Sequence, residues 1–318
     1  MKKDNKKSQI DHDNKWKVII SNLFEDFINF FLPNLYELVD FQSPIEFLEQ
    51  ELYKLIDDKI KQGKVINDKL AKVKLKSGEE KWILIHIEIQ SSFELDFNER
   101  MFTYFYRIYD SYNQKITAIA IYTDKTPKEH SAFNYEFSGT RLLYEFNSYK
   151  ITSPKQKELL ESDNPFALVV LTCQYLLKTK NDLDKRLSFK LKLIRLAKDK
   201  QYEDKQIINL LKFIDFILIL PSELEQKFQN EIISKYIEPK DMKLTESQIE
   251  FANKVHIALY GETIKEKAVR EETEKFVIEK TISIQKLIRS SDLSDNKIAE
   301  IFNTTAKFVS EIRNNMNV

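Results

Sequence analysis

The segment at 82–90 alternates strictly between apolar and polar side chains, as a β-strand does when one of its faces packs into a core. Four isoleucines would share the apolar face. The polar face carries Leu84, His86, Glu88 and Gln90. A second strand-like stretch, at 65–75, brings the carboxylate of Asp68 to the same polar face across a turn that contains Gly78. Two carboxylates and an amide on one sheet face are groups that can bind a metal ion and orient water.

The register of this hairpin follows from its two faces. If the turn is centred on Gly78, paired residues have numbers that sum to 156, and Val73 pairs with Ile83. The apolar faces then coincide, and a slip of one residue would mix them. In this register Asp68 lies opposite Glu88, with Cβ atoms about 5 Å apart.

Two carboxylates at that spacing repel each other, and a divalent cation removes the repulsion. Hard oxygen ligands suit Mg²⁺, with Mn²⁺ as the alternative. The competing interpretation is that Glu88 is a solvated charge at a strand edge and Asp68 a turn residue, with no joint role.

Composition excludes several other kinds of site. The four glycines, at positions 63, 78, 139 and 261, are too far apart for a Rossmann or Walker A phosphate loop. The single cysteine, Cys173, excludes an internal disulfide and a cysteine-rich zinc site. Fifty basic residues balance fifty acidic ones, so a nucleic-acid surface would have to be local.

The sequence predicts a cytoplasmic protein without membrane contact. The first 16 residues contain no apolar stretch of the kind found in signal peptides. The longest apolar stretches, Phe166–Leu177 and Phe213–Leu220, are shorter than the roughly 20 residues that a membrane span needs.

Hydrophobic periodicity predicts a mixed α/β region followed by helices alone. Helices are expected at 16–32, where Pro33 ends the run, and at 47–61. Strands at 65–75 and 81–90, a helix at 97–112, a strand at 116–122 buried on both faces and a strand at 141–151 follow. Asn164 and Pro165 indicate the N-cap and first residue of a helix. The expected helices are 165–178, 184–200, 204–219, 222–236, 246–260, 262–290, 294–303 and 305–314.

These elements predict five successive parts of the chain. They are a flexible N-terminus (1–14), an α/β domain (15–153), a helical domain (154–260), a connecting helix (261–290) and a helix-turn-helix-like tail (291–318).

Asp68, then Glu88-x-Gln90, then an aromatic helix together resemble the core of the PD-(D/E)XK nuclease superfamily. There the order is helix, strands bearing Asp and Glu-x-Lys, helix, strand. The run at 86–112 resembles, more specifically, the Rpn family of recombination-promoting nucleases, also described as putative YhgA-like transposases. Further strings that carry the resemblance are Phe24–Phe27, Phe31–Pro33, Asp68–Leu70, Val73–Leu75, Ser162–Ala167, Phe213–Asp215 and Leu220-Pro221. The resemblance covers most of residues 13–230. It implies an α/β restriction-endonuclease-like core, a mixed sheet flanked by helices, followed by an all-helical C-terminal part.

The resemblance also implies a Mg²⁺-dependent DNA endonuclease that hydrolyses phosphodiesters with metal-activated water. Asp68 and Glu88 would be the metal ligands, helped by the backbone carbonyl of Ile89. Gln90 occupies the place of the superfamily lysine, as is common in this family; it can orient water but brings no charge.

Two questions stay open at this point. Many superfamily members add an acid from the first helix, and Glu25, Asp26 and Glu51 are the candidates. The same site could transfer a strand to a DNA 3′-hydroxyl instead of to water. The alternative function is a non-catalytic DNA-binding or assembly protein that retains the nuclease fold.

Several features near these motifs have competing explanations. The stretch Lys178–Lys200 holds nine basic and three acidic residues, which suits either phosphate neutralisation or a solvated helix. Arg100 could contact a phosphate, although a solvated face is the commoner role. His86 is expected to be a hydrogen-bonded, partly buried histidine. Tyr104, Tyr106 and Tyr109 are expected to be core aromatics.

The stretch at 293–312 resembles a degenerate helix-turn-helix. Ser294 can cap its first helix, Ala299 allows close packing and Asn303 tolerates the turn conformation. Its second helix carries Lys307 and Arg313 against Glu311, which is little charge for reading a DNA groove. Packing or oligomerisation is the alternative, and the charged helix Glu262–Lys280 is a candidate for self-association into a homo-oligomer.

Overall fold

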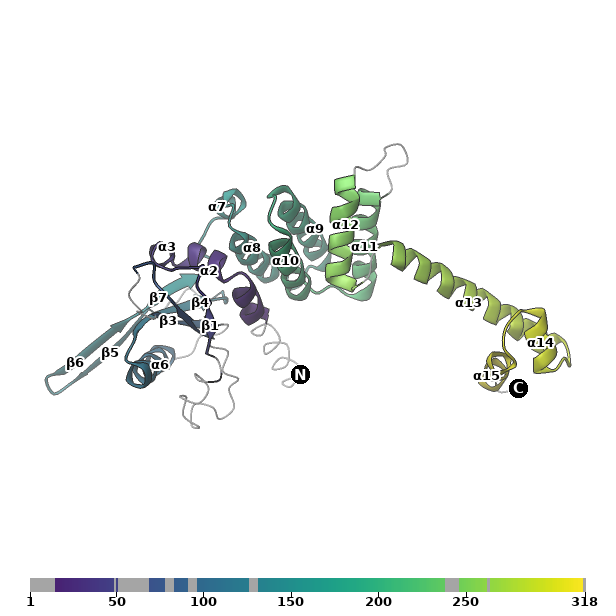
Figure 1. The fold of residues 1–318 in the computed structure, drawn as a ribbon, viewed down its shortest axis with the longest axis horizontal. Coiled ribbons are helices and arrows are strands. Elements are labelled where there is room, and N and C mark those ends of the chain that lie inside the picture. Colours follow the sequence, from purple (N-terminus) through teal and green to yellow (C-terminus); the bar gives the residue numbers. More distant parts are fainter. Residues whose placement is uncertain are drawn as a thin grey trace. The chain divides into compact units, whose positions relative to one another are not determined.

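The computed structural model describes residues 15–48, 50, 69–77, 83–90, 96–125, 131–237, 246–261 and 264–316. They fall into two compact units that divide between Lys235 and Tyr236, and each unit is described by itself (Figure 1). The first unit is mixed α/β with a helical second half, and the second is helical. The predicted mixed α/β class with a helical C-terminal part is therefore confirmed at this level.

A five-stranded mixed sheet forms the centre of the first unit, with the strand order β1-β2-β3-β4-β7. Its first two pairings are antiparallel, and the pairings of β3 with β4 and of β4 with β7 are parallel. The strands are β1 (Glu46–Phe47), β2 (Lys69–Val73), β3 (Ile83–Gln90), β4 (Lys115–Tyr122) and β7 (Asn147–Lys150). The helix α6 (Phe97–Tyr112) makes the crossover that a parallel β3–β4 pair requires.

The hairpin register predicted from the sequence is confirmed. The five observed pairs of β2 and β3, from Lys69 with Ile87 to Val73 with Ile83, all have numbers that sum to 156. The continuous apolar run of β4 is also buried as predicted, from Ala118 to Tyr122.

Helices cover both faces of the sheet. Ala71 and Val73 pack in one core with Phe27 of α2 (Phe24–Phe31) and Phe166 of α8 (Pro165–Lys178). On the opposite face, Leu70 packs with Tyr104 and Ile108 of α6. Leu70 is completely buried, so the face on which the sequence places the polar side chains is covered by α6 at this point.

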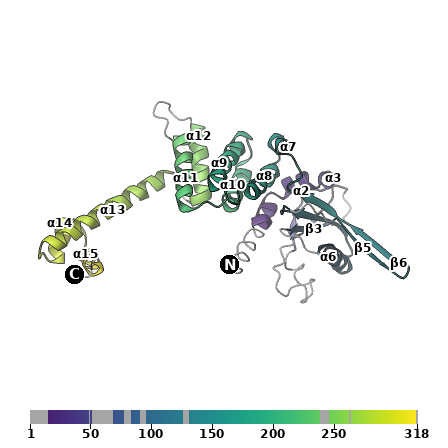
Figure 2. The same cartoon turned by 180° about the vertical axis from the view of Figure 1, so that it is seen from behind.

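A separate two-stranded ribbon, β5 (Ala132–Phe137) and β6 (Thr140–Glu145), lies beside α6 and extends away from the sheet in both views (Figures 1 and 2). Ser138 and Gly139 in its turn both have positive φ, 44° and 87°, as hairpin turns of type I′ require. The ring of Phe133 stacks on Phe102 of α6, with centroids 5.1 Å apart. The predicted single strand at 141–151 is therefore wrong, because the chain changes sheets at Phe146.

The N-terminal helices also differ from the prediction. Residues 15–22 are helical, Leu23 interrupts the helix, and α2 then runs to Phe31. Pro33 begins a new short helix, α3 (Pro33–Tyr36), instead of only ending the previous one. The helix predicted at 47–61 is wrong at Phe47, which lies in β1, and residues 51–61 lie outside the described residues.

The rest of the first unit is helical. The helices α7 (Gln156–Glu161), α9 (Leu183–Asp199) and α10 (Asp204–Ile217) pack on α8, and α11 (Ser222–Ile237) follows them and runs across the boundary of the unit. The predicted start of α8 is confirmed, because the Asn164 side chain accepts a hydrogen bond of 2.9 Å from the backbone N–H of Phe166 and Pro165 is the first helical residue. Every residue of α8 from Pro165 to Tyr175 is buried, so this helix is the centre of the main core.

The second unit contains α12 (Glu246–Tyr260), α13 (Ile264–Ser290), α14 (Asp295–Ile301) and α15 (Ala306–Asn315). Ile284 and Ile288 of α13 share a small core with α14 and α15. Two features predicted for the tail are confirmed, because Ala299 is buried and Asn303 has φ 46° in the turn. The Ser294 side chain makes no cap hydrogen bond, contrary to expectation. Within the described residues, no helix is both long and apolar enough to cross a membrane.

Candidate active site

The metal site predicted from the sequence involves β3 and Asp68, the residue that precedes β2 in the sequence. Asp68 lies outside the described residues, and for Glu88, Ile89 and Gln90 the structure describes only the backbone. That backbone forms the last three positions of β3. Within the described side chains, no group of three or more His, Cys, Asp or Glu is placed to hold a metal ion. The side chains of Asp68 and Glu88 are not among the described ones, so this absence does not concern them.

The register of β3 against β4 defines the position of Glu88 and Gln90 in the sheet. Glu88 is in register with Ala120, and Gln90 with Tyr122. Neighbouring residues in register occupy the same face of a sheet. Ala120 and Tyr122 pack with Phe97 of α6. The register positions of Glu88 and Gln90 are therefore on the α6 face, at the carboxyl end of β3.

The carboxyl ends of three parallel strands meet at this edge of the sheet. Gln90, Tyr122 and Lys150 occupy one row across β3, β4 and β7. In open α/β sheets, ligands bind at the carboxyl ends of parallel strands. The edge that carries the predicted catalytic positions is thus the edge at which a ligand site is expected from topology alone.

A buried ion pair lies at the same edge. Lys150 Nζ is 3.2 Å from Oδ1 of Asp124, and the two side chains are 7% and 10% exposed. The ammonium group also lies 5.7 Å from the centre of the Tyr122 ring. Sequence reasoning missed both charged residues. An acid two residues beyond a strand buried on both faces was a usable signal for Asp124, whereas nothing in the local sequence marked Lys150.

The acids of the first helix are held by contacts elsewhere. Both carboxylate oxygens of Asp26 accept hydrogen bonds from Nε2 of Gln206, at 3.0 and 3.1 Å. Burial raises the pKa of the Asp26 carboxyl. Glu25 accepts a hydrogen bond of 3.2 Å from the Tyr36 hydroxyl, and Glu51 lies outside the described residues. The core of α2 packs on the sheet face opposite α6, so no described contact joins Glu25 or Asp26 to the register position of Glu88.

The aromatic helix α6 is buried on a narrower stripe than predicted. Tyr104 is a core residue, as expected. Tyr106 and Tyr109 are 53% and 50% exposed, so their assignment to the core is wrong. Arg100 lies with its guanidinium 5.2 Å from the centre of the Phe97 ring. The side chain of His86 lies outside the described residues.

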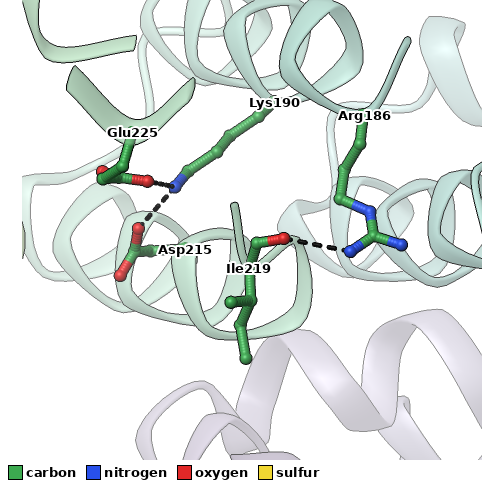
Figure 3. Close-up of polar contacts among 5 residues, drawn as sticks. All are labelled: Arg186, Lys190, Asp215, Ile219 and Glu225. Carbon is green, nitrogen blue, oxygen red and sulfur yellow. Dashed lines mark hydrogen bonds and ion pairs between the residues drawn. The ribbon is translucent and has the colours of Figure 1, made fainter. Parts of the chain in front are cut away.

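Two basic residues of the stretch Lys178–Lys200 are committed to internal contacts (Figure 3). Lys190 is completely buried, and its Nζ lies 2.7 Å from Oδ1 of Asp215 and 2.9 Å from Oε2 of Glu225. The guanidinium of Arg186 donates hydrogen bonds of 3.0 Å to the carbonyls of Ile219 and Thr179. Neither explanation offered for the stretch, phosphate neutralisation or a solvated helix, therefore applies to Lys190, because its side chain is buried among the helices.

Three other basic residues of α9 are exposed on one face. Lys185, Lys192 and Arg195 are separated by seven and three residues, the spacing of one helix face. None of the three forms an ion pair with another described residue. No acidic residue occurs between Asp184 and Asp199. We call Lys185, Lys192 and Arg195 the basic face of α9.

In the tail, one of the two basic residues expected on the second helix, Arg313, makes internal contacts. Arg313 Nε lies 2.9 Å from Oδ1 of Asp295, and Nη2 donates a hydrogen bond of 3.0 Å to the carbonyl of Leu293. Arg313 thus fastens α15 to the start of α14. Lys307 is exposed, and Glu311, one helical turn further along, is exposed as well.

Comparison with known proteins gives one match. Residues 11–122 match the family model described as putative transposase, YhgA-like. The matched segment ends with the last residue of β4 and spans roughly a third of the chain. It confirms the resemblance seen in the sequence over this segment, whereas α7 to α15 lie beyond it. Comparisons with curated proteins and with solved structures gave no match.

Proposed function

We propose that the protein is a metal-dependent DNA endonuclease with a PD-(D/E)XK core, on the basis that residues 11–122 match the family model described as putative transposase, YhgA-like. The observation that carries the proposal is the register of β2 with β3. Five consecutive pairs follow the register on which the metal-site argument depends. Continuing the ladder by one pair would set Asp68 opposite Glu88.

The order of elements supports the same core. The described elements follow one another as α2, α3, β1, β2, β3, α6 and β4. Apart from the short α3 and β1, this is the order of helix, two strands, helix and strand that the resemblance implies. The site would lie at the carboxyl end of β3, where the topology of the parallel strands also favours a ligand.

Different residues of the proposed site would bind the metal ion and orient the attacking water. Asp68, Glu88 and the carbonyl of Ile89 are hard oxygen donors of the kind that Mg²⁺ prefers, with Mn²⁺ as the second choice. A bound divalent cation would lower the pKa of water and screen phosphate charge. Gln90 would orient the attacking water through its amide. Water then forms a new P–O bond, one ester P–O bond breaks, a proton leaves the water, and the departing oxygen takes up a proton.

The partner in this proposal is DNA, and the basic face of α9 is the surface proposed to contact its backbone. Lys185, Lys192 and Arg195 are exposed, and no acidic residue occurs in α9 between Asp184 and Asp199. Contacts of this kind are independent of base sequence and strongly dependent on salt.

A second function has one observation in its favour. Tyr135, Phe137 and Leu142 lie on one face of the β5–β6 ribbon and are 37% to 70% exposed. An uncovered apolar ribbon is a feature of proteins that assemble. The alternative is therefore a non-catalytic DNA-binding or assembly protein that retains the nuclease fold.

The deciding experiment is nicking of supercoiled plasmid by the wild type and Asp68→Asn, with Mg²⁺ and with a chelator. We expect Mg²⁺-dependent nicking by the wild type and its loss in Asp68→Asn, together with a loss of Mg²⁺ binding in calorimetry. Asp110→Asn, which replaces an exposed acid on α6, is the matched control and should nick as the wild type does. Equal nicking by the wild type and Asp68→Asn would reject the proposed site.

A further inference from the structure

The row Gln90, Tyr122 and Lys150 places a lysine on the same sheet edge as the proposed active site. All three positions lie on the face that α6 covers, because residues in register share a face. Gln90 stands where the superfamily has a lysine, so the proposed site lacks a cationic group on β3. The row brings a lysine to the same face from β7.

The position of the ammonium group is fixed by two described contacts. Lys150 Nζ pairs with Oδ1 of Asp124 at 3.2 Å, and it lies 5.7 Å from the centre of the Tyr122 ring. Tyr122 belongs to β4, the strand between Lys150 and Gln90. The backbones of β7 and β3 are two strand spacings apart, about 10 Å. The side chain of Lys150 thus extends from β7 towards β4, whose Tyr122 is in register with Gln90.

The buried ion pair of Lys150 and Asp124 is not explained by the stability of the fold alone. Taking two charges out of water costs about as much as their attraction returns, and apolar residues of similar size often stabilise a core equally well. Lys150 and Asp124 are nevertheless both about nine-tenths buried, at an edge where the topology favours a ligand. A buried charge beside a proposed reaction centre is a candidate for a functional role.

We propose that Lys150 supplies the positive charge that Gln90 lacks, and that it stabilises the negative charge developing on the scissile phosphate. Asp124 is the positioning residue that holds the ammonium group at the edge of the sheet. This inference rests on the proposed nuclease function. The competing explanation is a link between β4 and β7 with no part in the reaction.

The test combines Lys150→Met with a rescue. Lys150→Met removes the charge and keeps much of the length of the side chain. The single-turnover nicking rate at saturating Mg²⁺ should fall by about 10²–10³-fold, as when one stabilising donor is removed from an active site. Affinity for Mg²⁺ alone should stay the same or rise, because a neighbouring positive charge is removed. Adding Gln90→Lys to Lys150→Met should restore at least about a tenth of the wild-type rate, since it returns a cation to the same row.

The matched control is Lys200→Met. Lys200 also has a largely buried side chain in an ion pair, with Asp163, but it belongs to the helical part of the unit. Its variant should nick at the wild-type rate. If Lys150→Met does not fold, the double variant Asp124→Asn with Lys150→Gln removes both charges together and keeps the hydrogen-bonding groups. The same loss and the same rescue by Gln90→Lys are then expected.

The outcomes separate this inference from the proposed function. If the wild type nicks, Asp68→Asn does not, and Lys150→Met nicks normally, Lys150 has no part in the reaction and the nuclease proposal stands. A slow Lys150→Met that Gln90→Lys fails to rescue would also overturn the inference, because it indicates a structural link. Absence of Mg²⁺-dependent nicking in the wild type would overturn both.

Discussion

Lys190 Nζ lies 2.7 Å from Oδ1 of Asp215, and this ion pair joins α9 to α10 where the lysine side chain is only 1% exposed. Glu225 of α11 supplies a second carboxylate at 2.9 Å, and the ring of Phe228 lies 4.3 Å from Nζ. Three helices thus meet at one buried cation. The same helix α9 presents its basic face to solvent, so its lysines divide into one that holds the fold and others that are exposed to a partner.

Lys190→Met should therefore destabilise the first unit. Removing one partner of a buried ion pair leaves buried charges uncompensated, which typically costs about 3–5 kcal/mol. We expect about 3 kcal/mol, because Asp215 and Glu225 remain partly exposed to water. Lys192→Met, which replaces an exposed lysine of the same helix, should change stability by less than about 0.5 kcal/mol. Denaturant unfolding measures both, and equal stability of the two variants would contradict the role given to Lys190.

The hairpin register could be predicted because local information specified it. A strict alternation of side chains and a turn centred on Gly78 leave one register that keeps the two faces separate. The same kind of signal existed for β5 and β6. Ser138-Gly139 directly follows a stretch in which Phe133, Tyr135 and Phe137 alternate with polar residues. The prediction of one strand at 141–151 overlooked that turn.

The charged core could not be predicted from local pattern. The partners of Lys190 lie 25 and 35 residues away in sequence, and nothing near Lys190 indicates them. The ion pair of Lys150 with Asp124 has a sequence separation of 26. Helical periodicity also overestimated the apolar stripe of α6, because Tyr109 matches the pattern but remains half exposed. Long-range packing decides which members of a periodic set are covered.

The basic face of α9 should control the salt dependence of DNA binding. Replacing Lys185, Lys192 and Arg195 by glutamine should weaken binding at low salt. It should also reduce the slope of log K against log[salt] by roughly 3, about 0.9 for each phosphate that the protein no longer neutralises. Fluorescence anisotropy with a random-sequence duplex measures the slope. The control replaces the exposed residues Lys157, Lys205 and Lys227 by glutamine, and should leave the slope unchanged. Identical slopes for both triple variants would place the DNA-binding surface elsewhere.

Asp26→Asn should stabilise the protein at neutral pH. Burial raises the pKa of the Asp26 carboxyl, and the hydrogen bonds from Gln206 oppose this only in part. An acid with a raised pKa in the folded state binds its proton more tightly there, so its ionised form disfavours folding. This unfavourable contribution is complete above the folded pKa and vanishes below the unfolded pKa, about 3.9.

The measurement is thermal unfolding of the wild type and Asp26→Asn at several pH values. The variant should have the higher Tm at pH 7, and the difference should narrow towards zero below about pH 4. A lower Tm of Asp26→Asn at pH 7 would mean that the two hydrogen bonds from Gln206 outweigh the effect of burial.

Gln90→Ala separates water orientation from metal binding at the proposed site. The variant removes the amide that would orient the attacking water and leaves Asp68, Glu88 and the carbonyl of Ile89 in place. Mg²⁺ affinity should therefore be unchanged, in contrast to its loss in Asp68→Asn. The nicking rate should fall by up to about 10²-fold, the cost of misplacing a reacting group by roughly 1 Å. Calorimetry with Mg²⁺ and single-turnover nicking, performed on the same preparation, test the two expectations together. A loss of Mg²⁺ binding in Gln90→Ala would make Gln90 a metal ligand, and an unchanged nicking rate would leave the orientation of water to another residue.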